Sequence, residues 1–195
     1  MSTILQNETL LGLAELLKVA PDSFSKEINL IAETNHRYLK DLKINLSNAL
    51  AYGNLSKKES FLLALSVAVN EKNTSLKNIF IHLAKEEGAT EEEIAETYAC
   101  VSLLNANNVF YRFRHFTKKE FYETTPAGIK MSIMMNPVLG KEFFELMSLA
   151  VSSLNGCELC VNSHEASLTG LGSSQARIYD AVRLAAIVKS VAVIY

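Results

Sequence analysis

Apolar residues along this chain recur at the spacing of an α-helix. Long stretches repeat their hydrophobic positions with a helical period, and none alternates convincingly between apolar and polar residues as a half-buried strand does. Glycine and proline are few, with 8 and 3 residues among 195. The pattern predicts helices near residues 7–19, 23–51, 57–71, 74–87, 91–109, 126–134, 138–155, 157–169 and 174–193. The range 23–51 accommodates either one helix or two, and the sequence as a whole predicts an all-α protein.

Residues at the ends of several ranges support this interpretation. The stretches 56–59 and 90–93 each begin with Ser or Thr and carry Glu three residues later, which is the capping-box pattern of a helix N-terminus. The pairs Thr-Pro at 125–126 and Asn-Pro at 136–137 predict an N-cap followed by proline at the first helical position. These signals place helix starts at four points along the chain.

Two segments of the chain resemble each other at a fixed offset of about 82 residues, counted on the sequence. The offset pairs Phe61 with Phe143, Ser66 with Ser148, Asn73 with Asn155, His82 with His164, and Gly88 with Gly170. Amphipathic helices share Ala and Val by composition alone, whereas matching Asn, His and Gly at one offset favours an internal duplication.

The duplication predicts a single domain over residues 1–195, with repeat halves at roughly 57–109 and 138–193. The halves differ in their chemistry. Only the second half carries the neighbouring thiols Cys157 and Cys160. We therefore expect the first half to be a scaffold and the second half to hold the working site.

Charge and cysteine content narrow the functional classes. The formal net charge is -2 with 49% hydrophobic residues, so the chain lacks the basic footprint of a nucleic-acid or anionic-membrane binder. The N-terminal stretch MSTILQNETL has no secretory-signal pattern, and the apolar range 182–195 is too short and too charged to span a bilayer. Three cysteines form no disulfide framework, so we predict a cytoplasmic protein.

The stretch NGCELCVNSHE, residues 155–165, gathers two of the three cysteines beside a histidine. On a helix that begins near Cys157, the side chains of Cys157, Cys160 and His164 share one face. The helix N-terminus stabilises a thiolate, and a neighbouring imidazole can accept its proton. The Cys-x-x-Cys spacing also brings the Cα atoms near the separation that a disulfide requires. The motif favours redox-active thiols.

The positions of the two thiols suggest different tasks. Cys160 is one turn from His164 and lies deeper in the predicted helix, where substrate access can be gated. Cys157 lies at the helix start, where a resolving or exchanging thiol would meet a partner. Glu145, inside the apolar stretch FFELMSLAV, is costly to bury without a partner, so we expect it to orient His164. The alternative is that Glu145 lies on the surface of an amphipathic helix.

Other interpretations of the cysteine pair are weaker. A zinc site needs four ligands, and the motif supplies three. Covalent haem attachment needs histidine directly after the second cysteine, where Val161 stands, and a thioredoxin-like motif needs a βαβ context. Buried apolar cysteines remain an alternative, although the polar neighbours of the motif argue against it.

Several further residues have structural interpretations. Cys100 lies in a helix with an apolar face and is expected in the core. His82 is expected to pack or to cap a helix. Arg112, Arg114 and His115 are expected either to contact another subunit or to shape the thiol pocket.

Three stretches together resemble the alkyl hydroperoxidase D (AhpD) family. They are FELMSLAVSSLNGCELCVNSHE at 144–165, NANNVFYRFRHF at 105–116 and MSIMMNPVLGKEFFEL at 131–146. The family signature joins Glu, Cys-x-x-Cys and a histidine four residues after the second cysteine. The resemblance runs from about residue 28 to the end, and the first 27 residues are less familiar.

The resemblance implies an all-helical fold with an internal two-fold repeat, a homotrimer and a weak peroxidase in an antioxidant chain. In that chain a lipoylated acyltransferase of the 2-oxoacid dehydrogenase complexes reduces the disulfide through dihydrolipoamide. The reduced protein then reduces a peroxiredoxin, AhpC. No bound metal, haem or flavin is implied.

The resemblance also implies a role for each residue of the site. Cys160 would form the sulfenic acid, Cys157 would donate a proton and close the disulfide, and Glu145 with His164 would relay protons. Some members carry a second histidine just before the second cysteine, where this chain has Leu159. That departure puts direct peroxide turnover in doubt more than disulfide exchange.

Three alternatives follow for the function. The first is an electron-transfer adaptor between lipoyl groups and a peroxiredoxin, with little peroxidase activity of its own. The second is an enzyme like the carboxymuconolactone decarboxylases of the wider superfamily, which share the fold without redox thiols. The third is a helical interaction module with unreactive cysteines.

Overall fold

The computed structural model describes residues 7–51 and 53–195, and all regular structure in these ranges is helical. The elements are α1 Glu8–Leu17, η2 Pro21–Ser23, α2 Lys26–Glu33, α3 Tyr38–Leu50, α4 Lys57–Asn70, α5 Thr74–Glu86, α6 Glu91–Thr117, α7 Glu120–Thr124, η3 Ser132–Met134, α8 Lys141–Leu154, α9 Glu158–Gly170 and α10 Gln175–Ala192. This confirms the all-α prediction. Residues 1–6, the first part of the N-terminal stretch MSTILQNETL, lie outside the described residues. Within those ranges, no helix is both long enough and apolar enough to cross a membrane.

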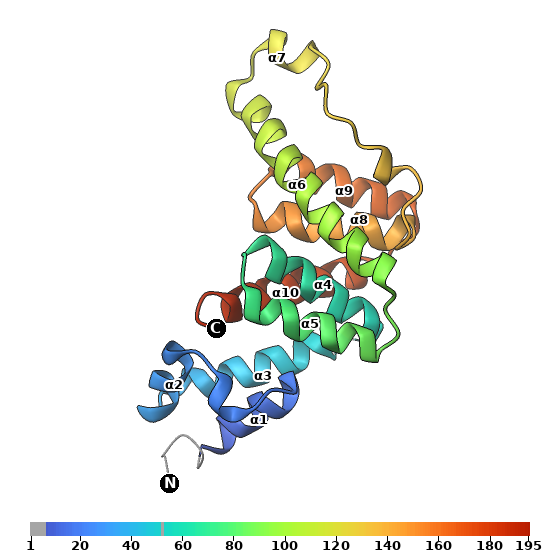
Figure 1. Cartoon of the computed structure of the whole chain (residues 1–195). Helices are drawn as coiled ribbons and strands as arrows, with labels where there is room; N and C mark the ends of the chain where they lie inside the picture. The colour runs from blue at the N-terminus through green and yellow to red at the C-terminus, as the bar shows by residue number, and fades with distance from the viewer. Residues whose placement is uncertain (1–6, 52) are drawn as a thin grey trace.

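The helices form an elongated stack (Figure 1). Helices α1 to α3 lie at one end, α4, α5 and α10 in the middle, and α8 and α9 with part of α6 beyond them. The C-terminal end of α6 and the short α7 project from the stack as an arm. Helices α4 and α5 pack as one antiparallel pair and α8 and α9 as another, while α10 packs against α3, α4 and α8.

Helix α8 is the central helix around which the site is built. Its residues 143–152 are all buried, because α4, α6, α9 and α10 surround it. A helix that is buried on every side is expected to be apolar all round. The buried stretch 143–152, FFELMSLAVS, fits this requirement except at Glu145, Ser148 and Ser152, which are buried polar residues. Each of these three therefore needs a hydrogen-bond partner.

Several sequence-based helix boundaries agree with the structure. Both predicted capping boxes are present, with the Ser56 and Thr90 side chains accepting from the third backbone N–H and the glutamates bonding back. The range 23–51 contains two separate helices, α2 and α3. Helix α6 continues to Thr117, well past the predicted end at 109.

The prediction of a helix over 126–134 was wrong, and α8 begins at Lys141 rather than at 138. The only regular structure in 126–140 is the single turn η3, and α7 just before it was not predicted. The helix cannot extend back through Gly140, and the segment before it is anchored to α6. The Glu96 carboxylate accepts hydrogen bonds from the backbone N–H groups of Val138 and Leu139, at 2.8 and 2.6 Å. These two residues are thereby held in a loop before Gly140, whose φ is 79°.

The two packed helix pairs have matching lengths. Helices α4 and α8 have 14 residues each, and α5 and α9 have 13 each. Their starts differ by 84 residues, from 57 to 141 and from 74 to 158, against the offset of about 82 in the sequence. The duplication and its two halves therefore stay predictions.

Candidate active site

The turn between α8 and α9 positions the two cysteines. Asn155 ends α8, and Gly156 adopts φ 66°, a left-handed conformation that suits glycine. Cys157 is the N-cap of α9, and its backbone N–H donates to the Ser152 carbonyl at 3.1 Å. Cys157 and Cys160 are joined in a disulfide with a Cα–Cα distance of 5.3 Å. The motif thus lies across the first turn of a helix, as the spacing predicts.

The two sulfurs differ in access. Cys160 is 6% exposed and lines a cavity of about 400 Å³, whereas Cys157 is fully buried. The expectation that Cys157, at the helix start, would meet a partner is therefore wrong, because its side chain is fully buried. A molecule that reaches the disulfide through this cavity meets Cys160 first.

The cavity is mostly apolar and is built from three parts of the chain. Helix α6 contributes one face, η3 with the residue before it contributes two methionines, and α9 contributes the thiol side. The lining residues are Leu104, Asn107, Tyr111, Met131, Met134, Leu159, Cys160, Ser163 and His164. A concave apolar site with a few polar groups is the form that small-molecule sites take.

Glu145 and His164 form a buried pair beside the thiols. His164 Nδ1 lies 2.7 Å from Glu145 Oε2, and the two residues are 8% and 4% exposed. The alternative that Glu145 lies on the surface is therefore wrong. Burial by itself raises the pKa of Glu145, but the hydrogen bond and charge of His164, with a smaller effect of Lys141, lower it below its usual value. Glu145 is thus held as a carboxylate that orients the imidazole.

Lys141 is a part of this arrangement that the sequence did not reveal. Its ammonium lies 3.3 Å from Glu145 Oε1, one turn away on α8, and donates to the Met134 carbonyl at 2.6 Å. The lysine therefore links the carboxylate to the methionine segment over the cavity. The i, i+4 spacing of Lys141 and Glu145 was the available signal.

A second missed feature is a chain of amide side chains behind Cys157. Asn108 on α6 donates to the Ser152 hydroxyl at 2.9 Å and accepts from the Asn155 amide at 2.9 Å. Asn155 also accepts from Asn70 at 3.1 Å. The network ties α4 and α6 to the turn that carries the cysteines. The density of asparagine in NANN was its only sign in the sequence.

Two of the three charged residues after NNVFY also contact the cysteine segment. Arg112 donates to the Asn155 carbonyl at 2.5 Å, and His115 Nε2 lies 3.4 Å from a Glu158 carboxylate oxygen in the first turn of α9. Arg114 instead bonds to the Thr125 carbonyl. Arg112 and His115 therefore contact residues that flank the cysteines, but neither lines the Cys160 cavity, and a contact with another subunit stays a prediction.

The remaining candidates lie away from this chemistry. Cys100 is fully buried, where burial raises the pKa of its thiol to about 12, so it is a core residue as predicted. His82 is wrongly predicted to pack or cap, because its side chain is 63% exposed and lies 3.6 Å from Glu86 on the same helix.

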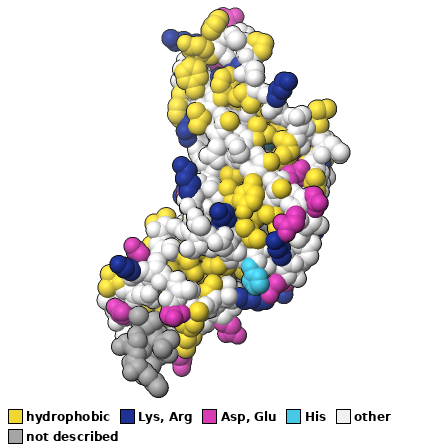
Figure 2. Space-filling view, in the orientation of Figure 1, with side chains coloured by type: hydrophobic (Ala, Val, Ile, Leu, Met, Phe, Trp, Pro, Cys, Tyr) yellow, Lys and Arg dark blue, Asp and Glu magenta, His cyan; other side chains and the backbone are white. Residues whose placement is uncertain are grey.

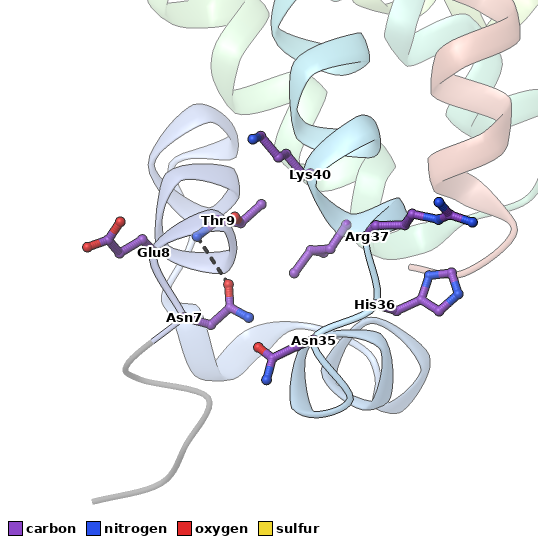
Figure 3. Close-up of a pocket in the computed structure, with 8 residues that line it drawn as sticks. Asn7, Glu8, Thr9, Asn35, His36, Arg37 and Lys40 are labelled. Carbon is purple, nitrogen blue, oxygen red and sulfur yellow. Dashed lines mark hydrogen bonds between the residues drawn. The ribbon is translucent and has the colours of Figure 1, made fainter.

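A separate hollow lies at the opposite end of the molecule, between the N-termini of α1 and α3 (Figure 3). It has a volume of about 380 Å³ and is lined by polar residues that include Asn7, His36, Arg37 and Lys40. Asn7 uses its side chain to cap α1, accepting from Thr9 and Leu10. No cysteine lines this hollow, so the Cys160 cavity is the better candidate for the active site.

Residues 122–194 match the Carboxymuconolactone decarboxylase family. The match begins in α7 and covers α8, α9 and α10, so it includes both thiols, Glu145 and His164. The α8–α9 hairpin, which carries the disulfide and the Glu145–His164 pair, therefore belongs to a segment typical of this family.

Comparison of most of the chain with individual proteins identifies the family more closely. A relative from Maricaulis maris, named alkyl hydroperoxide reductase AhpD, is 40% identical over 159 residues, which are 80% of this chain and 90% of that protein. Relatives of the same name from Rhodopseudomonas palustris and Anaeromyxobacter dehalogenans are 37% and 38% identical, over 85% and 79% of this chain and 91% and 82% of theirs. The chain belongs to the AhpD family.

Proposed function

We propose that this protein is a thiol peroxidase that reduces alkyl hydroperoxides at Cys160. The observation that carries the proposal is the placement of Cys160 in an apolar cavity together with His164, whose other side is bonded to the buried Glu145. The relatives' name, alkyl hydroperoxide reductase, supports a hydroperoxide as the substrate. The apolar lining suits a substrate with an organic group.

The reaction begins from the reduced pair. Glu145 and His164 remove the proton of Cys160, and the thiolate attacks the distal oxygen of ROOH. The S–O bond forms as the O–O bond breaks, and the leaving alkoxide takes a proton to give ROH. Cys160 is now a sulfenic acid, which Cys157 attacks to form the disulfide with loss of water. The 5.3 Å Cα–Cα distance supports this closing step.

Regeneration requires a dithiol, for which we propose dihydrolipoamide on a lipoylated 2-oxoacid dehydrogenase acyltransferase. Because Cys160 lines the cavity and Cys157 is buried, the incoming thiolate would attack Cys160 and release Cys157. The resulting mixed disulfide is then displaced by the second thiol of the donor. In the same way, the reduced pair would pass electrons to the disulfide of the peroxiredoxin AhpC.

One observation favours a second function, that of an adaptor between the lipoyl donor and AhpC. Leu159 is 44% exposed on the rim of the cavity, where some family members carry a relay histidine. An apolar side chain there supplies no proton to a leaving alkoxide, but it leaves disulfide exchange intact. The adaptor would show fast exchange and slow peroxide turnover.

We also propose that the protein forms a homotrimer through the projecting arm. Figure 2 shows hydrophobic side chains gathered along the arm. Phe113, Phe116 and Phe121 there are 45%, 71% and 71% exposed. Clustered exposed aromatic side chains are typical of protein interfaces. Light scattering on the protein and on Phe116→Ser tests this, since a monomeric parent protein contradicts the proposal.

The first experiment treats the reduced protein with one equivalent of cumene hydroperoxide and follows intact mass and disulfide mapping. We expect rapid loss of two protons, mapped to Cys157–Cys160. Cys160→Ser should be inert, whereas Cys100→Ser, the matched control, should react like the parent. An inert parent protein whose preformed disulfide is still reduced by dihydrolipoamide establishes the adaptor. Thiols that react with neither reagent contradict both functions, and any decarboxylase activity should then survive loss of both cysteines.

A further inference from the structure

Asn107 is a buried amide in the wall of the Cys160 cavity. It is 5% exposed and lies on the face of α6 that also presents Leu104 and Tyr111 to the cavity. These three residues are spaced three and four apart, so a single face of one helix carries them. Helix α6 packs against both α8 and α9, which holds this wall in place. Asn107 therefore lies in a wall of the cavity that is fixed by this packing.

The amide oxygen of Asn107 has no hydrogen-bond partner among the residues that the structure describes. Its nitrogen donates to the Met131 sulfur at 3.2 Å. Thioether sulfur is a weak acceptor, and methionine side chains repack readily. A buried carbonyl oxygen without a partner costs free energy, so natural proteins leave few of them. Such an atom, on a residue that lines the same cavity as Cys160, points to a hydrogen-bond donor that is supplied by a ligand.

The other polar groups near Asn107 in the cavity wall either have a hydrogen-bond partner or are exposed to solvent. His164 Nδ1 is engaged by Glu145, which leaves its Nε2 for the thiol or the leaving group. Ser163 is exposed at the cavity edge. Within this apolar cavity, Asn107 Oδ1 is the buried acceptor that lacks a donor.

We propose that Asn107 positions the substrate by accepting the hydroperoxide O–H on its side-chain oxygen, an inference that rests on the proposed peroxidase function. A hydroperoxide has one donor, the O–H of its distal oxygen, and this is the oxygen that the Cys160 thiolate attacks. Bonding this O–H to Asn107 fixes the distal oxygen while the proximal oxygen keeps its organic group in the apolar part of the cavity. Met131 gives up its contact with the amide as the substrate enters.

The bonded hydrogen is retained through the reaction. The thiolate sulfur forms a bond to the distal oxygen as the O–O bond breaks, so sulfur loses two electrons to the peroxide. The proximal oxygen leaves as alkoxide and receives the proton that His164 removed from Cys160. The distal O–H becomes the hydroxyl of the sulfenic acid, still within reach of the same carbonyl. Asn107 thus needs no change of protonation, which suits a neutral amide.

The test compares two reagents for the Cys160 thiolate. Cumene hydroperoxide offers an O–H, whereas methyl methanethiolsulfonate offers none. We expect Asn107→Leu, which keeps the side-chain size and removes the amide, to slow the reaction with the hydroperoxide about tenfold, the effect of one lost hydrogen bond in the transition state. Modification of Cys160 by the thiosulfonate and reduction of the disulfide by dihydrolipoamide should change less than twofold. Asn162→Leu, the same substitution at an exposed residue of α9 that does not line the cavity, is the matched control.

The outcomes separate the inference from the function on which it rests. A hydroperoxide rate that changes less than twofold in Asn107→Leu, or an equal fall with both reagents, overturns the positioning role. A parent protein that is inert to the hydroperoxide overturns the proposed function and this inference with it. If Asn107→Leu does not fold, Asn107→Ala, which is smaller and carries no acceptor, takes its place with the same two criteria.

Discussion

Replacing Glu145 by glutamine removes the negative charge beside His164 and leaves a side chain of nearly the same shape. The carboxylate lies 2.7 Å from His164 Nδ1 and is 4% exposed. Solvent therefore screens this hydrogen bond little. The substitution keeps an oxygen that can accept from Nδ1, so the ring orientation is largely preserved. What is lost is the stabilisation that the charge gives to the protonated imidazole.

The size of that loss follows from the two kinds of hydrogen bond. A bond to a charged group contributes about 1.5–3 kcal/mol and a neutral one about 0.5–1.5 kcal/mol. The substitution therefore removes about 1–2 kcal/mol from the protonated form of His164. Since about 1.4 kcal/mol corresponds to a factor of ten, we expect Cys160 to react with cumene hydroperoxide about 5- to 30-fold more slowly at pH 7.

The assay is stopped-flow oxidation of the reduced protein, together with the pH dependence of Cys160 alkylation. We expect the midpoint of alkylation to move to higher pH in Glu145→Gln, because the thiolate loses a cationic neighbour. Glu142→Gln is the matched control, since Glu142 lies one turn earlier on α8 and bonds to Arg177 instead. It should leave the thiol chemistry unchanged. Equal peroxide rates for Glu145→Gln and the parent would refute the assignment of Glu145 to the thiol site.

Three further predictions concern the thiol order, the loop before α8 and acid stability. Cys157→Ser should stop at Cys160 sulfenic acid after one equivalent of hydroperoxide, seen as a gain of one oxygen by mass spectrometry; a variant that still forms an intramolecular disulfide contradicts the order of the thiols. Glu96→Ala should lower the free energy of unfolding in urea by about 1–3 kcal/mol per backbone N–H left unpaired, and an unchanged midpoint would show that water replaces the carboxylate. Arg177 donates to the carboxylates of Glu59 and Glu142. Burial raises the pKa of each, but the bonds and charge of Arg177 lower both below the usual value. The stability from these two ion pairs is therefore fully present above pH 4.5, the usual pKa of a glutamate, and is lost as the pH falls through the lowered pKa values. Arg177→Met should therefore make the free energy of unfolding depend less on pH in the acid range. An unchanged pH dependence would contradict this role of Arg177.

Helical periodicity and capping residues were sufficient to identify the elements that carry the site. The α9 motif could be predicted because residues three and four apart share a helix face whatever surrounds the helix. Pairing Glu145 with His164 was also within reach, because a carboxylate inside an apolar run requires a partner, and the histidine lies on the next predicted helix. These inferences use local geometry and the cost of burial.

The loop before α8 shows where local reasoning fails. Asn136 and Pro137 are good helix-start residues, yet Glu96, some forty positions earlier in the chain, binds the next two backbone N–H groups. The φ of 79° at Gly140 is not helical, so a helix cannot run from Pro137 into α8, and the residues before Gly140 are held instead by this contact with α6. No local signal in 136–140 reports the contact.

The sequence by itself determined the helices that carry the site, the shared face of Cys157, Cys160 and His164, and the need of Glu145 for a partner. Only the tertiary structure decided that Cys160 lines the cavity while Cys157 is buried, and that Asn107 lines the same cavity. The physical reason is that periodicity specifies which face of a helix is buried, whereas the packing of α6 against α8 and α9 specifies what that face meets. Access to the sulfurs depends on this packing.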